Sequence, residues 1–276
     1  MIIRPDWRIL TIGDGDLSFS YSLAKYHPTQ KLVASVYDHE DILRAKYQDH
    51  LFLDSLKQLD IEVHTGLDIT KSESYKALLK NHQHQFDVVI FQFPLITGED
   101  SYQAYLKDGN QISPNLLNRS LLRSFLLNSF KEFLDPDGER LCFITSKDVK
   151  PYIEWDIERS LTLKTNIQYL GKTPFDIEDF PEYKIRNVNR DKFVKDTAGH
   201  TFIWTDLTDL KPDSALSELA LAPMTNYDHS EFCSICRSGP FTSEADCQLH
   251  LMTKKHAQLT QYHEDWLKFL DNEPVQ

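Results

Sequence analysis

Short apolar runs alternate with stretches of helical periodicity over the first 205 residues. The apolar runs predict strands at 9–12, 32–37, 61–64, 86–93, 140–145, about 166–170 and 200–205. Apolar residues at helical spacing predict helices at about 19–26, 40–59, 72–81, 116–134 and 152–163. The run 86–93 is apolar on both faces, which is typical of a central parallel strand. The alternation therefore predicts an α/β fold, a doubly wound and mostly parallel sheet with helices on both faces.

The first predicted strand runs into a glycine turn, and a helix follows it. Gly13, Asp14 and Gly15 form this turn, and the helix begins near Ser18. Glycines let the backbone approach a ligand closely, and the N–H groups at a helix start favour a carboxylate or phosphate. The third glycine of the dinucleotide fingerprint is missing, because Ser18 stands there. This favours S-adenosylmethionine over a dinucleotide, although Gly-Asp-Gly is also ordinary turn chemistry.

Two acidic residues follow the next two predicted strands. Asp38 ends the second strand, where folds of this kind bind ribose hydroxyls, and Asp68 follows the third. The C-terminal ends of parallel strands meet at one edge of the sheet. We therefore expect both carboxylates at the same ligand crevice as the glycine turn.

Two later segments suggest substrate binding. The segment 95–113 reads as a loop, and its length favours a lid or a substrate-binding role. The segment 183–195 is the best local basic patch, with Tyr183 and Phe193 interleaved for stacking among Lys184, Arg186, Arg190, Lys192 and Lys195. Its alternative interpretation is a solvated surface loop.

Composition limits the class of protein. The 276 residues carry a net charge of −12, which argues against a uniformly basic nucleic-acid binder and requires any contact with RNA to use a local patch. No apolar run approaches the length of a membrane span, and the first residues have no signal-peptide layout. We expect a cytoplasmic protein, or a nucleolar one in a eukaryote, whose oligomeric state is open.

The C-terminal segment has the spacing of a zinc site. Cys233 and Cys236 form a Cys-x2-Cys knuckle, and His250 and His256 follow in a Cys-x2-Cys-x13-His-x5-His pattern. Two thiolates and two imidazoles can close a tetrahedron around Zn²⁺. The remaining cysteines, Cys142 and Cys247, have no evident partner. The predicted organisation is a main domain at 1–206, a linker at 207–230, and a zinc finger with a C-terminal helix at 231–276.

The residues of both parts resemble known families. The finger is similar to U1-like and matrin-type fingers, which implies binding to double-stranded or structured RNA. The main domain resembles the ribosomal RNA uridine-N3 methyltransferases over roughly residues 8–205. The resemblance rests on the motif at 12–20, Tyr37-Asp38, residues 86–94, Gly98, Lys147, Pro151-Tyr152, Trp155 and Phe180-Pro181-x-Tyr183.

The resemblance implies a class I methyltransferase sheet and site residues. Gly13, Asp14 and Gly15 would hold the methionine part of S-adenosylmethionine, Asp38 the ribose hydroxyls, and Asp68 would lie near the adenine amino group. For the transfer itself, Gln92 can hydrogen-bond the edge of the target base, Phe93 can stack on it, and Lys147 can stabilise a deprotonated imide. The family has an Asn where this chain has Gln92, and usually a His where it has Leu95.

Two other functions stay open at this point. One is a methyl or related alkyl transferase for a small molecule or a peptide, with the finger docking a protein partner. The other is a non-catalytic RNA-binding protein that kept the fold. The resemblance favours RNA, and ribosomal RNA in particular, as the substrate.

Overall fold

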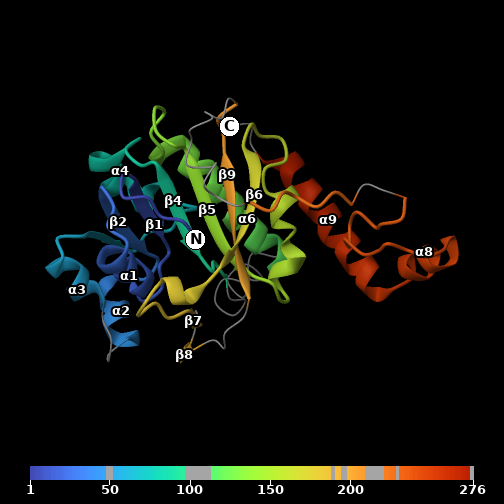
Figure 1. Cartoon of the computed structure of the whole chain (residues 1–276), viewed down its shortest axis with the longest axis horizontal. Helices are drawn as coiled ribbons and strands as arrows, with labels where there is room; N and C mark the ends of the chain where they lie inside the picture. Colours follow the sequence, from blue (N-terminus) through green and yellow to red (C-terminus); the bar gives the residue numbers. More distant parts are fainter. Residues whose placement is uncertain are drawn as a thin grey trace.

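A computed structural model describes residues 1–47, 52–96, 113–187, 190–193, 198–208, 221–227 and 230–273. Its main sheet has seven strands in the order β3-β2-β1-β4-β5-β9-β6 (Figure 1). These strands are β1 (Arg8–Ile12), β2 (Lys31–Val36), β3 (Glu62–Thr65), β4 (Val88–Gln92), β5 (Leu141–Lys147), β6 (Gln168–Phe175) and β9 (Gly199–Thr205). A separate hairpin joins β7 (Arg186–Asn187) to β8 (Arg190–Phe193).

The pairing of the strands creates a switch point at β1. The strands β3, β2, β1, β4 and β5 pair in parallel, whereas β9 is antiparallel to both β5 and β6. β1 pairs with β2 on one side and with β4 on the other, so the connections leave in opposite directions. In open α/β sheets a ligand crevice forms outside the strand ends at such a point.

Successive residues of the central strands belong to different hydrophobic cores, one on each face of the sheet. Ile9 packs with Phe19 and Leu23 of α1, whereas Leu10 packs with Phe125 and Leu126 of α6. The helices therefore cover both faces of the sheet, as the sequence predicts. The helical elements are α1 (Ser18–Tyr26), α2 (Glu40–Lys46), α3 (Phe52–Gln58), η1 (Ser72–Tyr75), α4 (Lys76–His82), α6 (Pro114–Asn128), η2 (Ser129–Phe133), η3 (Tyr152–Trp155), α7 (Ile157–Ser160), η4 (Ile177–Asp179), α8 (Glu244–Leu251) and α9 (Lys254–Asn272).

Two predicted helices are interrupted. The helix expected at 40–59 is divided, because α2 ends at Lys46 and α3 begins at Phe52. The helix expected at 152–163 breaks at Asp156, which has left-handed backbone angles (φ 48°, ψ 49°) and separates η3 from α7. An aspartate tolerates this conformation better than most residues. Of the loop expected at 95–113, residues 97–112 lie outside the described part of the chain.

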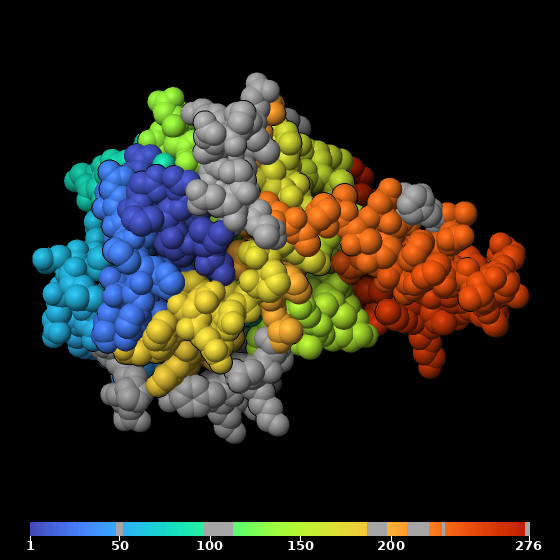
Figure 2. All heavy atoms as spheres, in the orientation of Figure 1, coloured from blue at the N-terminus to red at the C-terminus, as the bar shows by residue number. Residues whose placement is uncertain are grey.

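The last helix joins the C-terminal segment to the main domain. α9 begins beside the expected finger and packs its distal half against the sheet domain (Figures 1 and 2). Trp266 is fully buried, and its indole N–H donates to the Ser160 carbonyl at 2.9 Å. Arg123 of α6 forms an ion pair with Glu273 at 2.8 Å. Within the described residues, no helix combines the length and apolarity that a membrane crossing requires.

Candidate functional site

A cavity of about 510 Å³ opens over the C-terminal ends of β1, β2 and β4. The predicted residues that line it are Gly13, Asp14, Gly15, Asp38, Asp68, Gln92 and Phe93. They come from four separate stretches of sequence that the parallel pairing brings to one edge. The cavity is large enough for a drug-sized ligand such as a nucleoside derivative.

The floor of the cavity depends on a glycine. Gly13 has φ +64°, and a Cβ there would lie 2.6 Å from the Phe91 ring. Any other residue would strain the backbone and displace a core side chain. The turn is thus built so that the chain backbone itself borders the ligand space.

Two buried carboxyl groups stand behind this turn. Asp14 accepts the Ser20 backbone N–H at 2.7 Å, and burial together with the nearby Asp16 raises its pKa to about 7. Asp16 accepts from the Ser18 N–H and pairs with the Arg186 guanidinium at 2.5 Å. Both carboxylates therefore hold the start of α1 in place, and Arg186 balances their charge.

The acids on the neighbouring strands border the same cavity. Asp38 forms an ion pair with Lys46 at 3.1 Å. Asp68 accepts from the Thr70 N–H and hydroxyl at 3.0 and 2.6 Å, and it pairs with Lys71 at 2.8 Å. Although burial opposes the shift, the hydrogen bonds from Lys71 and Thr70 lower the pKa of Asp68. Two carboxylates at adjacent strand tips suit the hydroxyl and amino donors of an adenosine.

Gln92 ends β4 at the opposite side of the cavity. It is 7% exposed, and neither its amide oxygen nor its amide nitrogen has a hydrogen-bond partner among the described residues. Leaving a buried amide unsatisfied is costly, and such groups call for an explanation. An incoming ligand with both donor and acceptor atoms would satisfy it.

Phe93 and Lys147 lie next to Gln92. Phe93 has φ +46° and packs edge-on against Phe175, with ring centroids 5.4 Å apart. The Lys147 ammonium lies 5.8 Å from the centroids of both the Phe93 and Tyr152 rings. Lys147 is 5% exposed, and burial lowers its pKa. Phe93 is among the described residues that line the cavity, whereas Lys147 is not.

The basic segment expected at 183–195 does not act as one surface patch. Arg186 is turned inward, where it pairs with Asp16 and its guanidinium lies 5.4 Å from the centroid of the Tyr47 ring. Tyr183 is buried against Phe19 and cannot stack on an exposed base. Lys195 lies outside the described residues. The role of Arg186 in the cavity wall was missed because 170 residues separate it from Asp16.

The four expected metal ligands do come together. Ligand atoms of Cys233, Cys236, His250 and His256 lie within 4.8 Å of one another. The His256 Nδ1 is 3.5 Å from the Cys233 Sγ and 3.4 Å from the Cys236 Sγ. Tetrahedral zinc with ordinary bond lengths requires a spacing of about 3.5 Å between sulfur and nitrogen. The His250 Nε2 is buried without a hydrogen-bond partner among the described residues, as expected of a ligand atom.

The sheet order and the cavity at its switch point define the class as a Rossmann-like fold. The family model for BMT5-like rRNA (uridine-N3-)-methyltransferases matches residues 10–187, and the chain belongs to this family. The family is one of S-adenosylmethionine-dependent RNA methyltransferases.

The chain has only distant similarity to individual known proteins. The 30S ribosomal A1408 methyltransferase from an uncultured bacterium is 14% identical with a TM-score of 0.41, over 73% of this chain and 88% of that one. A variant of the 16S rRNA (adenine(1408)-N(1))-methyltransferase of Catenulisporales acidiphilia is 11% identical with a TM-score of 0.39, over 73% of this chain and 85% of that one. Heavy metal-associated isoprenylated plant protein 41 of Arabidopsis thaliana is 28% identical over 181 residues, which are 64% of this chain and 32% of that protein. The chain thus spans about a third of the length of that curated relative.

Proposed function

We propose that this chain transfers the methyl group of S-adenosylmethionine to N3 of a uridine in ribosomal RNA. Membership of the family supports the reaction. In this chain, the unsatisfied amide of Gln92 is the observation that supports uridine as the acceptor. Its unsatisfied amide borders the cavity at the end where the acceptor must meet the cofactor. A uracil edge offers two carbonyl acceptors around one imide N–H, which an amide can read.

The cofactor occupies the side of the cavity formed by β1, β2 and β3. The backbone at Gly13 and Gly15, with Asp14 holding the turn, borders its methionine part. Asp38 accepts from the ribose hydroxyls, and Asp68 from the adenine amino group. The bound cofactor supplies an electrophilic methyl group, so the protein's task is to align the acceptor nitrogen with it and to exclude water.

The imide proton of uridine must pass to solvent water before or during the attack. The Gln92 amide N–H can donate to a uracil carbonyl and stabilise the negative charge that develops there. Phe93 supplies a stacking face for the base. Lys147 lies behind that ring without an ion-pair partner among the described residues, and its field favours an anionic imide. A target base in a loop reaches this site more readily than one in a duplex, because unpairing costs a few kcal/mol.

The C-terminal segment binds one Zn²⁺ through Cys233, Cys236, His250 and His256. The spacing of the ligand atoms and the orphaned His250 Nε2 support this assignment. The metal would hold the knuckle, the end of α8 and the start of α9 together and so present the finger to RNA. Lys254 and Lys255 open α9 directly before His256.

A methylation assay tests the proposed reaction. The purified chain and S-adenosylmethionine are incubated with total RNA, and the nucleosides are identified by mass spectrometry. We expect 3-methyluridine in the ribosomal RNA fraction. Gln92→Ala should lower kcat strongly and leave cofactor affinity unchanged, because Gln92 faces the acceptor. Methylation of proteins or small molecules but not of RNA would contradict the proposal.

A further inference from the structure

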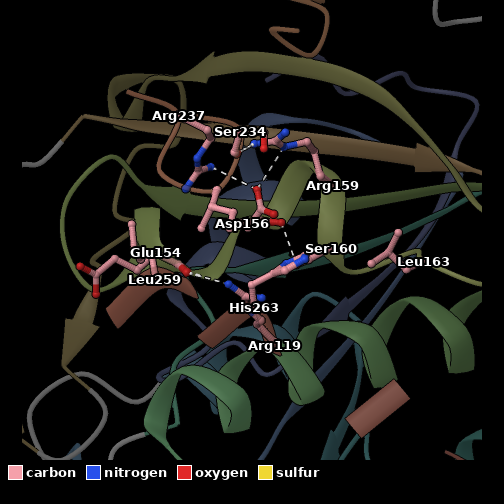
Figure 3. Close-up of a pocket in the computed structure, with 11 residues that line it drawn as sticks. Arg119, Glu154, Asp156, Arg159, Ser160, Leu163, Ser234, Arg237, Leu259 and His263 are labelled. Atoms are coloured by element: carbon pink, nitrogen blue, oxygen red, sulfur yellow. Dashed lines mark hydrogen bonds and ion pairs between the residues drawn. The ribbon is translucent and has the colours of Figure 1, made fainter. Parts of the chain in front are cut away.

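A second cavity, of about 190 Å³, lies between the main domain and the Cys/His segment (Figure 3). Its wall combines Arg119 of α6, Asp156 directly before α7, Arg159 of α7, Arg237 after the Cys-x2-Cys knuckle, and His263 of α9. None of these residues borders the cofactor cavity. A water molecule occupies about 30 Å³ in the liquid, so this space holds several waters or one small polyatomic ion.

Arg119 is the unusual member of the wall. It is 3% exposed, and its Nη2 donates to the Glu154 carbonyl at 3.0 Å. Its Nε and Nη1 have no hydrogen-bond partner among the described residues. Its guanidinium lies 5.9 Å from the centroid of the Trp266 ring, which offers a cation–π contact but no acceptor atom. A buried guanidinium with idle donors is poised for an acceptor that bears charge.

The other charges of the wall leave an excess of positive charge. Arg159 and Arg237 flank the Asp156 carboxylate, at 3.5 and 3.4 Å from its Oδ1 (Figure 3). Neither of these ion pairs is a hydrogen bond, so the Asp156 Oδ1 has no hydrogen-bond partner among the described residues. The Glu154 carboxylate is already paired with Lys150 at 2.7 Å. Three guanidinium groups therefore face one carboxylate, that of Asp156, which Arg159 and Arg237 share, in a protein whose net charge is −12.

We propose that this cavity binds one phosphate group of the RNA substrate, with Arg119 as the main donor. Guanidinium forks match phosphate oxygens, and a phosphate is small enough to enter. The location fits a substrate contact, because Arg237 donates to the carbonyl of Ile153, next to the Tyr152 that contacts Lys147. The inference rests on the proposed RNA substrate and adds a contact that joins the finger to the catalytic domain.

Replacing Asp156 tests the proposal through an expected increase in RNA affinity. Asp156→Asn removes the carboxylate that Arg159 and Arg237 share in the described wall, and asparagine tolerates the same left-handed backbone. If a phosphate binds here, this variant should bind more tightly, by at least about threefold, because a repulsive charge is lost. Partial unfolding cannot produce such a gain.

The experiment measures RNA affinity on the full-length, zinc-loaded chain. The probe is a fluorescent single-stranded RNA with a 5′-hydroxyl, so that all its phosphates are backbone diesters. Arg119→Gln should weaken binding by roughly tenfold and lower the slope of log Kd against log salt by about 0.7, the value for one phosphate contact on a single strand. Arg119→Lys should lie between this variant and wild type. Arg44→Gln and Asp54→Asn are charge-matched controls on an exposed ion pair and should change little.

Competition with inorganic phosphate distinguishes RNA backbone phosphate from free phosphate as the ligand of this cavity. If backbone phosphate binds, millimolar inorganic phosphate should displace RNA from wild type more strongly than from Arg119→Gln at equal ionic strength. If phosphate binds but neither Asp156→Asn nor Arg119→Gln changes affinity for the 5′-hydroxyl RNA, the cavity serves free phosphate and the proposal is wrong. Weaker binding by Asp156→Asn would show that Asp156 is a structural bridge, which also overturns it.

Cofactor binding by calorimetry is measured on the same samples. If the proposed function is wrong, the chain will not bind S-adenosylmethionine or will not methylate RNA, although the RNA-binding results still hold. A failure of the phosphate site alone would leave both of these intact.

Discussion

Asp14 shows how one buried side chain combines two roles. Its carboxyl group accepts the N–H of Ser20 and so fixes the turn that borders the cofactor space. It does so at a cost, because burial and Asp16 raise its pKa from 3.8 to about 7. The folded protein therefore binds this proton more tightly than the unfolded chain does.

This shift predicts a pH dependence of stability. The contribution of Asp14 is fully present below about pH 4 and is lost as the pH rises towards 7, by at most about 1.4 kcal/mol per pH unit. Asp14→Asn should flatten this decline, since its amide oxygen can still accept from Ser20. Urea unfolding at pH 5 and pH 7.5 measures the difference. Asp137→Asn, at an exposed carboxyl group, should leave the decline as it is in wild type. An equal decline in Asp14→Asn would rule the assignment out.

Asp38 makes the sharpest prediction about the cofactor. Asp38→Ala should remove a charge-assisted contact with the ribose and weaken S-adenosylmethionine binding by on the order of 1.5–3 kcal/mol. Calorimetric titration measures the affinity. Asp41→Ala changes an exposed acid of α2 that does not line the cavity and serves as the control. Unchanged affinity in Asp38→Ala would mean that the ribose binds elsewhere.

Among the elements, α9 joins the two parts of the protein. Its first turn carries His256, and its distal half buries Trp266 and Leu270 against the main domain. The knuckle adds contacts of its own, since Arg237 pairs with Asp156 and Arg159 donates to the Ser234 carbonyl. An ordered metal site would therefore also order the segment that follows β5.

A variant of the knuckle tests this coupling. The purified chain should contain about one zinc, and Cys236→Ser should lose it. Because the knuckle contacts η3 and Asp156, we expect the variant to raise KM for RNA and also to lower kcat modestly. Metal analysis and steady-state methylation give the three quantities. Cys247→Ser is the matched control, because the Cys247 thiol is not part of the Cys/His cluster. Full zinc content in Cys236→Ser would contradict the ligand assignment.

Trp266→Ala separates docking from metal binding. Removing a buried tryptophan from the interface should destabilise the protein by roughly 3–5 kcal/mol while the zinc content stays the same. Thermal unfolding and metal analysis follow the two effects. Leu267→Ala, at a partly exposed neighbour, should cost far less. Loss of zinc in Trp266→Ala would show that the metal site needs the docked helix.

At the scale of the whole molecule, the distribution of charge limits how RNA can bind. The chain is acidic, and Arg186, which belonged to the expected basic patch, lines the cavity at the strand tips and pairs with Asp16. We expect RNA contacts to use Lys254 and Lys255 and the arginines between the Cys/His segment and the main domain. RNA binding should weaken steeply with salt, with a slope of roughly 0.7 per contacted phosphate.

A charge change at the finger tests this distribution. Replacing both Lys254 and Lys255 with glutamine should reduce the salt slope and raise KM for RNA, with cofactor affinity unchanged. Replacing Lys76 and Lys80 of α4 in the same way is the matched control, because they lie on a helix of the main domain. An unaffected KM would indicate that the finger serves a partner other than RNA.

The sequence alone predicted the order of the strands of the main sheet, the glycine turn, the acids at the strand tips and the Cys/His cluster. These features are local, because a short stretch of sequence is enough to encode hydrophobic periodicity, a turn or the spacing of Cys and His residues. Parallel pairing then placed the tips of β1, β2 and β4 together, as a doubly wound sheet requires.

Tertiary structure alone decided which distant side chains meet. Arg186 reaches Asp16 across 170 residues, Trp266 reaches Ser160 across 106, and Arg237 reaches Asp156. A charged side chain has the same sequence signature whether it is solvated or buried against a counter-charge. Only the fold therefore revealed that Arg186 lines the cavity at the strand tips, and that the buried Arg119 lies between the Cys/His segment and the main domain with two donor groups that lack a hydrogen-bond partner among the described residues.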